Sequence, residues 1–156
     1  MENTFEIKVR KITEKDWDFL ESWWHDYPAW EGSSIPREML PGSYGGNDPG
    51  LATKEELETL GHGGFIAYKD ETPICACWLF LTNSKLAHVA PVVSNKHYRD
   101  TDRGEAIKKV IHFATHVAYE LGYEYAHAWS SHENFTKIYE DIGYTGQTVS
   151  ELTIKL

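Results

Sequence analysis

The sequence predicts an α/β (α+β) fold: a mixed, mostly antiparallel sheet with helices on both faces and a central parallel pair splayed at one end. The first observation is an apolar strand over 86–93, followed by a polar loop, an amphipathic helix and an aromatic strand over 123–129. This order gives two parallel strands joined by a right-handed crossover. Two apolar runs, 64–68 and 73–81, are joined by a tight turn and predict an antiparallel hairpin. The alternating tail over 149–156 would close the sheet.

The composition predicts one globular domain, 1–156, and argues against nucleic acid and membranes as its main binding partners. Apolar residues make up 41% and charged residues 25%, which is ordinary for a folded chain. The formal charge of −9 argues against nucleic acid as the main partner. Cys75 and Cys77 would point to the same face of one strand, so we interpret them as buried free thiols in a reducing, cytoplasmic setting. We see no signal peptide and no apolar run of the ~20 residues that span a bilayer, and we expect no membrane partner.

The first 24 residues predict a strand and then a helix. Phe5, Ile7 and Val9 alternate with charged residues, as in a strand with one buried face. Thr13 begins the helix, with Asp16 three residues later in the manner of a capping box. The inner side of this helix is expected to carry Trp17, Leu20 and Trp24.

The segment from His25 to His62 is rich in proline and glycine and breaks the regular pattern. Only 53–56, a second capping box, indicates a short helix toward Leu60. Because the segment also carries aromatic residues, we interpret it as a functional lid rather than a disordered loop.

The loop and helix after the 86–93 strand predict an anion site. The loop carries Lys96, Arg99 and Arg103. The helix has a single apolar stripe at helical spacing, made of Ala106, Ile107, Val110, Ile111, Ala114, Val117, Ala118 and Leu121. Gly122 suits a left-handed helix end. The unpaired N–H groups at the start of this helix, with the positive end of its dipole, can hold an anion.

The order of these elements, with a last helix over 134–144, resembles the GCN5-related N-acetyltransferases (the GNAT family). In that family this helix ends in a Tyr-Glu-x-x-Gly-Phe/Tyr pattern, matched here by Tyr139, Glu140, Gly143 and Tyr144. A second resemblance concerns small predicted acetyltransferases carried by tailed phages. It rests on Leu40-Pro41 and on the run over 78–83.

The family's other signature, Arg/Gln-x-x-Gly-x-Gly/Ala, wraps the pyrophosphate of acetyl-coenzyme A. In the register that we prefer, it falls on 101–106, with Gly104 and Ala106 kept and Thr101 in place of arginine. In the other register Arg99 is kept and Asp102 replaces the first glycine. The resemblance implies acetyl-coenzyme A (acetyl-CoA) as cosubstrate and no metal. The cofactor-binding residues that it implies are Val92, Val93, Ser94, Arg99, Thr101, Asp102, Arg103, Gly104, Glu105, Ala106 and Asn134.

Acetyl transfer to an amine needs a polarised carbonyl, a base and a proton for the departing thiolate. We expect the backbone N–H of Val93 to polarise the carbonyl and Tyr139 to supply the proton. The alternative for Tyr139 is a packed aromatic residue with a satisfied hydroxyl. His88 is the candidate base, and His127 on the next strand is its rival. His112 and His116, four apart on a helix, are interpreted as a solvated face.

The expected acceptor is an amine of a small molecule or a peptide. The wall facing it would be formed by Trp24, Tyr27 and Trp30, with acidic neighbours that suit a cation. The alternative is that these aromatics fill the core beneath the loop. Two other functions stay open: a non-catalytic GNAT-fold binding module that has lost acetyl-CoA use, and a related enzyme with another acyl donor. We expect a monomer or a homodimer.

Overall fold

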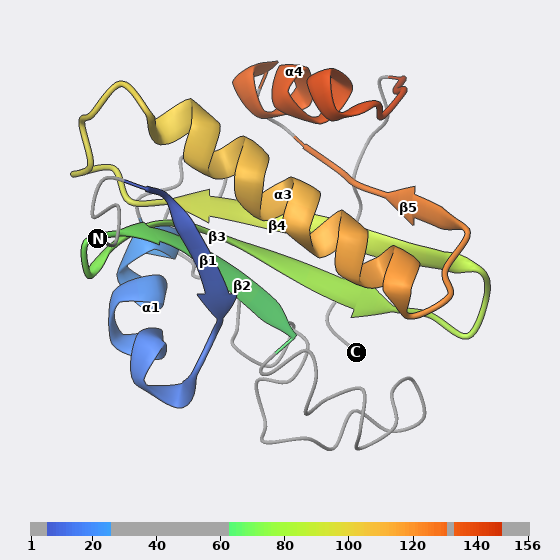
Figure 1. Cartoon of the computed structure of the whole chain (residues 1–156), viewed down its shortest axis with the longest axis horizontal. Helices are drawn as coiled ribbons and strands as arrows, with labels where there is room; N and C mark the ends of the chain where they lie inside the picture. Colours follow the sequence, from blue (N-terminus) through green and yellow to red (C-terminus); the bar gives the residue numbers. More distant parts are fainter. Residues whose placement is uncertain (1–5, 26–62, 131–132, 148–156) are drawn as a thin grey trace.

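The computed structural model describes residues 6–25, 63–130 and 133–147, and it contains a mixed five-stranded sheet (Figure 1). The strands lie in the order β1-β2-β3-β4-β5. The first four pair antiparallel, and β4 and β5 pair in parallel. The predicted fold class is therefore confirmed. The strands are β1 (Lys8–Lys11), β2 (Gly64–Lys69), β3 (Thr72–Leu81), β4 (Leu86–Ser94) and β5 (Tyr125–His127).

β3 lies in the middle of the sheet, as its apolar sequence predicts. Its residues from Ile74 to Leu79 are all buried, which is expected of a strand covered on both faces. The turn into it from β2 places Asp70 and Glu71 at φ 47° and 67°. Two consecutive left-handed residues make the tight hairpin turn that matches the twist of the strands.

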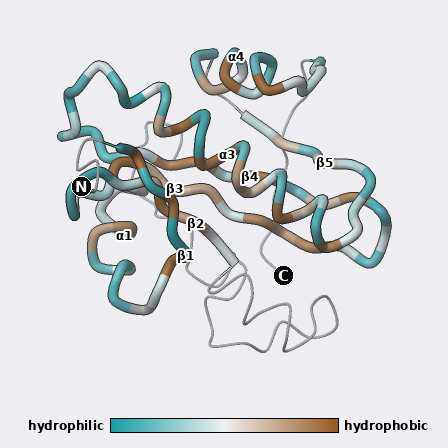
Figure 2. The backbone as a smooth tube through the Cα atoms, viewed as in Figure 1, coloured by the Kyte–Doolittle hydropathy of each residue, from teal (hydrophilic) through white to brown (hydrophobic). Residues whose placement is uncertain are grey.

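One face of the sheet is covered by α3 (Arg103–Glu120), with α4 (Glu133–Ile142) beyond it (Figure 1). The predicted stripe of α3 faces the sheet: six of its residues are buried, and Val117 and Leu121 are partly buried against the same cluster. Figure 2 shows hydrophobic colour running along β3 and β4 and recurring on α3. Gly122 (φ 91°) and Gly143 (φ 122°) follow the two helices in the left-handed conformation that glycine adopts easily.

The opposite face is covered by α1 (Trp17–His25). Trp17, Leu20 and Trp23 pack there with Trp78 and Val93 of the sheet. Trp17 and Leu20 are thus buried as predicted, and Trp23, which the sequence pattern did not single out, joins them. The side chain of Trp24 lies outside the described part of the structure.

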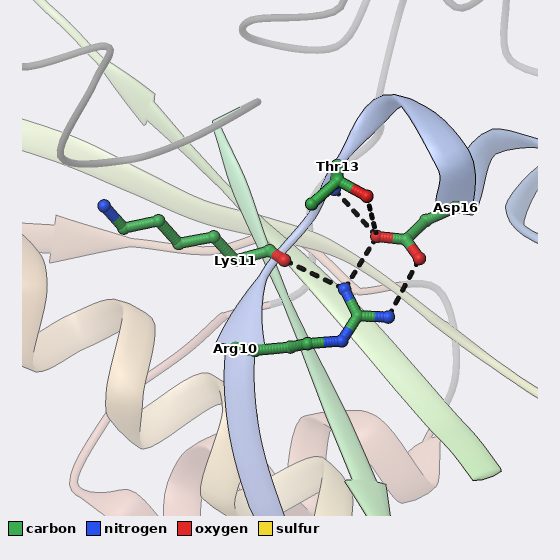
Figure 3. A network of polar contacts seen from close by, with 4 residues as sticks. All are labelled: Arg10, Lys11, Thr13 and Asp16. Carbon is green, nitrogen blue, oxygen red and sulfur yellow. Dashed lines mark hydrogen bonds and ion pairs between the residues drawn. The ribbon is translucent and has the colours of Figure 1, made fainter. Parts of the chain in front are cut away.

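A short 3-10 turn, η1 (Glu14–Asp16), leads into α1 and is held by a polar network (Figure 3). Asp16 accepts hydrogen bonds from the Thr13 N–H at 2.7 Å and the Thr13 hydroxyl at 3.2 Å. Arg10 donates to both carboxylate oxygens, at 2.7 and 2.8 Å. The predicted capping pair is therefore present, reinforced by a strand arginine.

Some predicted elements fall outside the described residues: the helix at 53–60, the segment 26–62 and the closing strand at 149–156. β5 is shorter than predicted and ends at His127. Within the ranges that the structure describes, no helix is both long and apolar enough to cross a membrane.

Candidate active site

β4 and β5 separate partway along β4, and this separation creates the candidate site. They pair over three positions only: Leu86 with Tyr125, Ala87 with Ala126 and His88 with His127. β4 then runs on to Ser94, six residues beyond the last pair. The predicted splay toward Ser94 is therefore present.

The first residue beyond the last pair, Val89, directs its carbonyl to the side that β5 leaves. Its partner on β3, Leu79, donates its own N–H the other way, to Gly63 at 2.8 Å. This makes Leu79 and Val89 a non-hydrogen-bonded pair. The carbonyl of Val89 instead accepts a hydrogen bond from the hydroxyl of Tyr139 at 2.6 Å. Tyr139, 5% exposed, thus places its hydroxyl where the two strands begin to part.

β4 carries an irregularity just beyond this point. Val89 pairs with Leu79 and Val92 with Cys77, so β4 has one residue more than β3 across this interval. The extra length includes the Ala90-Pro91 peptide bond, which is cis. A bulge of this kind re-aims the backbone that follows it, and such bulges are common beside active sites.

The backbone direction after the bulge corrects one expectation. Asn95 donates its N–H to the carbonyl of Ile74 on β3, at 2.8 Å. Because backbone polar groups alternate in direction along a strand, Val93 also faces β3. Its N–H belongs to the β3–β4 ladder and cannot lie in the gap as we predicted. The backbones of Val92 and Ser94 turn toward the side that β5 has left.

His88 and His127 stand side by side on the sheet face opposite α3. Their Nδ1 atoms are 3.0 Å apart and their ring centroids 5.0 Å apart, with the ring planes at 84°. Trp129 packs against both rings, at 5.6 and 6.3 Å between centroids. Burial, and then the nearby His127, lower the pKa of His88 below its ordinary value of 6.5. The candidate base is thus neutral near pH 7, and the two rival histidines are direct partners.

The start of α3 lies by the far end of β4. Its N-cap residue, Asp102, makes no side-chain hydrogen bond to the helix. Gly104, in the first turn, is exposed, and a side chain there would meet no other atom within 4 Å. The guanidinium of Arg103 donates to the Ser94 hydroxyl, which ties the helix to the strand. An anion could therefore approach the N–H groups of this turn.

The Asp102 carboxylate binds two side chains outside α3, and one of them, Lys69, is a cation. Lys69, from the β2–β3 turn, contacts it at 2.9 Å, and the Tyr98 hydroxyl donates to it at 2.8 Å. The Lys69 hydrogen bond, and then that of Tyr98, hold the pKa of Asp102 below its ordinary value. Burial and the hydrogen bond to Asp102 raise the pKa of Tyr98. The acidic residue in the phosphate signature thus carries its own cation.

Some of the other predicted cofactor-binding residues are exposed to solvent, and the rest are buried. Arg99, Thr101, Glu105 and Asn134 are exposed, the first three around the start of α3 and Asn134 in the first turn of α4. Ala106 is fully buried, so its small side chain serves packing. The side chains of Val92 and Val93 are buried in the clusters on opposite faces of the sheet.

Three residues of this site were not predicted from the sequence: Lys69, Tyr98 and Trp129. Trp129 had a signal, because it follows His127 by two residues and residues two apart in a strand share a face. Tyr98 lies four residues before Asp102, but in an irregular loop that spacing predicts no contact. Nothing in the sequence connects Lys69 to a residue 33 positions later. The predicted acceptor wall at Tyr27 and Trp30 falls outside the described residues.

Comparison with solved structures identifies the fold. The aminoglycoside N-acetyltransferase AAC(6')-Iy, in complex with a bisubstrate analogue of coenzyme A, matches with a TM-score of 0.61 at 14% identity, over 97% of this chain and 99% of that one. An aminoglycoside acetyltransferase from an uncultured soil metagenomic sample, in complex with sisomicin, has a TM-score of 0.62 at 14% identity, over 96% of both chains. A transcriptional regulator from Bacillus halodurans has a TM-score of 0.64 at 15% identity, over 97% of this chain and 100% of that one.

No protein-family model matches the sequence. No curated protein matches it either. The resemblance of Leu40-Pro41 and 78–83 to phage proteins has no support among the solved structures above and stays a prediction. Identities of 14–15% establish the architecture alone. The chain has the fold of the GCN5-related N-acetyltransferases, as the order of its elements and the motif from Tyr139 to Tyr144 predict.

Proposed function

We propose that this protein is an acetyl-CoA-dependent N-acetyltransferase that moves an acetyl group to an amine acceptor. One observation carries the proposal: the candidate base and the residue that binds the candidate acid are neighbours on β4, at the point where β4 and β5 part. His88 is the last paired residue of β4, and Val89, the next, holds the Tyr139 hydroxyl. A helix start suited to an anion lies at the other end of the same strand segment.

The splayed segment supplies the binding surface in this proposal. The pyrophosphate of the cosubstrate binds the first turn of α3 around Gly104, where N–H groups and the helix dipole favour negative charge. The exposed Arg99 adds a cation beside it. The pantetheine arm follows Val92 and Ser94, whose backbone faces the gap, so a polarising N–H would come from Ser94 rather than from Val93.

Tyr139 is the proposed general acid. Its O–H now points to the Val89 carbonyl, and a small rotation of the hydroxyl would direct the proton to a sulfur atom lying in the gap. A phenol with an ordinary pKa of ~10 is better matched to a thiolate than a carboxylic acid is. His88 is the proposed base that removes the proton of the amine.

The proposed acceptor is a small-molecule or peptide amine that approaches from the α1 side of the sheet. His88 lies on that face, next to Trp129 and Phe80, whose rings are 6.0 Å apart between centroids. Aromatic surface of this kind suits an amine-bearing ligand, and the formal charge of −9 favours a cationic one. Two of the structures above are described as acetyltransferases of aminoglycosides, which are amines. A single domain over 1–156 and a cytoplasmic location complete the proposal.

Ligand binding is the first test. A thermal-shift titration with acetyl-CoA, coenzyme A and a longer acyl-coenzyme A should show stabilisation that grows with ligand concentration. Preference for the longer donor would favour an enzyme with another acyl substrate. No shift at millimolar concentration of any of the three would contradict the proposal.

Tyr139→Phe is the second test. It should lower turnover of acetyl-CoA per folded molecule by ~10²–10⁴-fold, the usual contribution of a positioned general acid. It should also reduce stability by ~1 kcal/mol, because the buried Val89 carbonyl loses its donor. Tyr123→Phe is the matched control, since that hydroxyl donates to the Thr82 carbonyl at 2.9 Å, at the paired end of β4. The control should lose stability and keep its turnover.

The second candidate function is a non-catalytic binding module with the same fold. The observation in its favour is that the Tyr139 hydroxyl already has a partner, so a structural role accounts for it. One of the similar structures is described as a transcriptional regulator and not as an acetyltransferase. A shared fold therefore does not by itself imply acetyl transfer. Equal turnover per folded molecule for Tyr139→Phe and wild type would remove Tyr139 from the mechanism.

A further inference from the structure

The paired histidines at the mouth of the splay differ in their access to solvent. His88 on β4 is partly buried, whereas His127 on the three-residue strand β5 is exposed. Their Nδ1 atoms are 3.0 Å apart, which is hydrogen-bonding distance. One atom of this contact must therefore donate a proton and the other must accept it.

This contact restricts the tautomers of a neutral pair. A neutral imidazole carries one N–H, so the ring that donates from Nδ1 has a bare, basic Nε2. The ring that accepts at Nδ1 carries its proton on Nε2 instead. The pair thus presents one basic nitrogen and one N–H at its two outer ends, with a mobile proton between the rings.

We propose that His88 and His127 form a proton relay that takes a proton from the acceptor amine and delivers it to solvent. The inference rests on the proposed acetyl transfer and adds His127 to it. His88 is the catalytic base that meets the amine, and His127 is the exit through which the proton leaves the partly buried site.

The proton balance closes without any further reactant. As the amine nitrogen bonds to the acetyl carbon and the C–S bond of acetyl-CoA breaks, the amine proton passes to Nε2 of His88. Tyr139 protonates the departing thiolate and regains its proton from water. The proton on Nδ1 of His88 moves across the 3.0 Å contact to Nδ1 of His127. His127 then releases the proton on its Nε2 to water. The two rings end in the opposite tautomers, and exchange with water restores the starting state.

The packing around the pair keeps the contact in place. Trp129 meets the ring of His88 edge-on, at 63°, and lies at 40° to that of His127. The backbone ladder also aligns the two residues, because they are Cα partners in the parallel pair. The backbone pairing and the packing of Trp129 thus hold the two imidazoles in contact. A proton can pass between them without a prior conformational change.

The experiment compares His127→Ala and His127→Gln with wild type. Alanine opens a space at an exposed position, into which free imidazole can enter from solution. Glutamine can still hydrogen-bond to Nδ1 of His88 and so keep its orientation, but an amide cannot pass a proton through. His112→Ala, which removes an exposed histidine from the outer face of α3, is the matched control. Melting curves and acetyl-CoA thermal shifts are recorded for each variant.

Both His127 variants should lose about 10-fold in kcat, with KM for acetyl-CoA unchanged. This is less than the ~10²–10⁴-fold of a group that exchanges a proton directly with the substrate, because His127 acts through His88. Added imidazole should restore most of the loss in His127→Ala and none in His127→Gln. The control should keep wild-type turnover and show no response to imidazole.

Full turnover in His127→Gln would overturn the relay and leave His127 a positioning role only. Absence of imidazole rescue in folded His127→Ala would also overturn it. If His127→Ala does not fold, full turnover in His127→Gln still decides against the relay. Wild-type protein that binds acetyl-CoA but acetylates none of a panel of amines would refute the proposed function itself. That outcome is distinct from an active enzyme indifferent to His127.

Discussion

An aspartate lies at the start of both α1 and α3, but the two carboxylates have different roles. At α1, the carboxylate of Asp16 accepts from Arg10 and from both the N–H and the hydroxyl of Thr13, and it is 4% exposed. At α3, the carboxylate of Asp102 pairs with Lys69 and Tyr98 and makes no hydrogen bond to its own helix. The first carboxylate is enclosed by its donors, whereas the second lies beside an open helix start.

The comparison shows how one pair of charges can serve either stability or binding. Asp16 satisfies a backbone donor before α1, so little polar capacity is left there for a ligand. Asp102 leaves the first turn of α3 uncapped, and Lys69 offsets the negative charge that would repel phosphate.

Asp16→Asn should destabilise the protein by about 2 kcal/mol. The change weakens charge-assisted hydrogen bonds from Arg10 and Thr13 at a buried position. For a chain of this size the melting temperature should fall by about 4–8 °C. Asp18→Asn, an exposed change in the first turn of α1, is the control and should move it much less. Acetyl-CoA affinity of the folded protein should not change in either variant. An altered affinity in Asp16→Asn would contradict the structural role.

The same residue predicts a dependence of stability on acid. Burial favours the neutral carboxyl, but the hydrogen bonds from Arg10 and Thr13 outweigh it and place the pKa of Asp16 below its ordinary value of 3.8. A carboxyl with a lowered folded pKa stabilises the fold above its unfolded pKa, and this contribution is lost as pH falls through the folded value. The difference in unfolding free energy between wild type and Asp16→Asn should therefore shrink below about pH 4. Urea melts at pH 3, 5 and 7 measure it.

The sequence predicted most of the fold because long, regular patterns decide it. The stripe of α3, the doubly buried β3 and the glycine after each helix all appear where expected. The prediction that the Val93 N–H faces the gap was wrong, because the bulge at Ala90-Pro91 shifts the backbone alternation by one residue. A run of apolar residues does not reveal such a shift. The pairing of Lys69 with Asp102 depends on how the sheet folds and could not be predicted from local spacing.

Gly104→Trp should weaken acetyl-CoA binding by about 10-fold. A Cβ at this position meets no other atom within 4 Å, so the fold should tolerate the new side chain. The indole would lie over the first turn of α3, and loss of one charge-assisted hydrogen bond to phosphate corresponds to about that factor. Gly146→Trp is the matched control, since Gly146 is equally open and lies after α4. Calorimetric titration of both variants with acetyl-CoA measures the two affinities. Equal affinity in the two variants would place the cosubstrate elsewhere.

Lys69→Met and Asp102→Asn should change acetyl-CoA affinity in opposite directions. Removal of the Lys69 cation leaves the carboxylate of Asp102 unbalanced beside the phosphate, so affinity should fall by about 3-fold, the scale of one partly exposed ion pair. Asp102→Asn keeps the shape and an acceptor for the Tyr98 hydroxyl, removes the repulsion and lets Lys69 interact with phosphate, so affinity should rise by about 3-fold.

Titrations of these two variants at 50 and 500 mM salt separate charge from shape. Screening weakens interactions between exposed charges, so the two variants should converge on wild type at the higher salt. The double variant should lie near wild type at both salt concentrations, because it removes one charge of each sign. If both single variants weakened binding equally at both salt concentrations, Lys69 and Asp102 would be structural partners like Arg10 and Asp16. The two helix starts would then differ only in exposure.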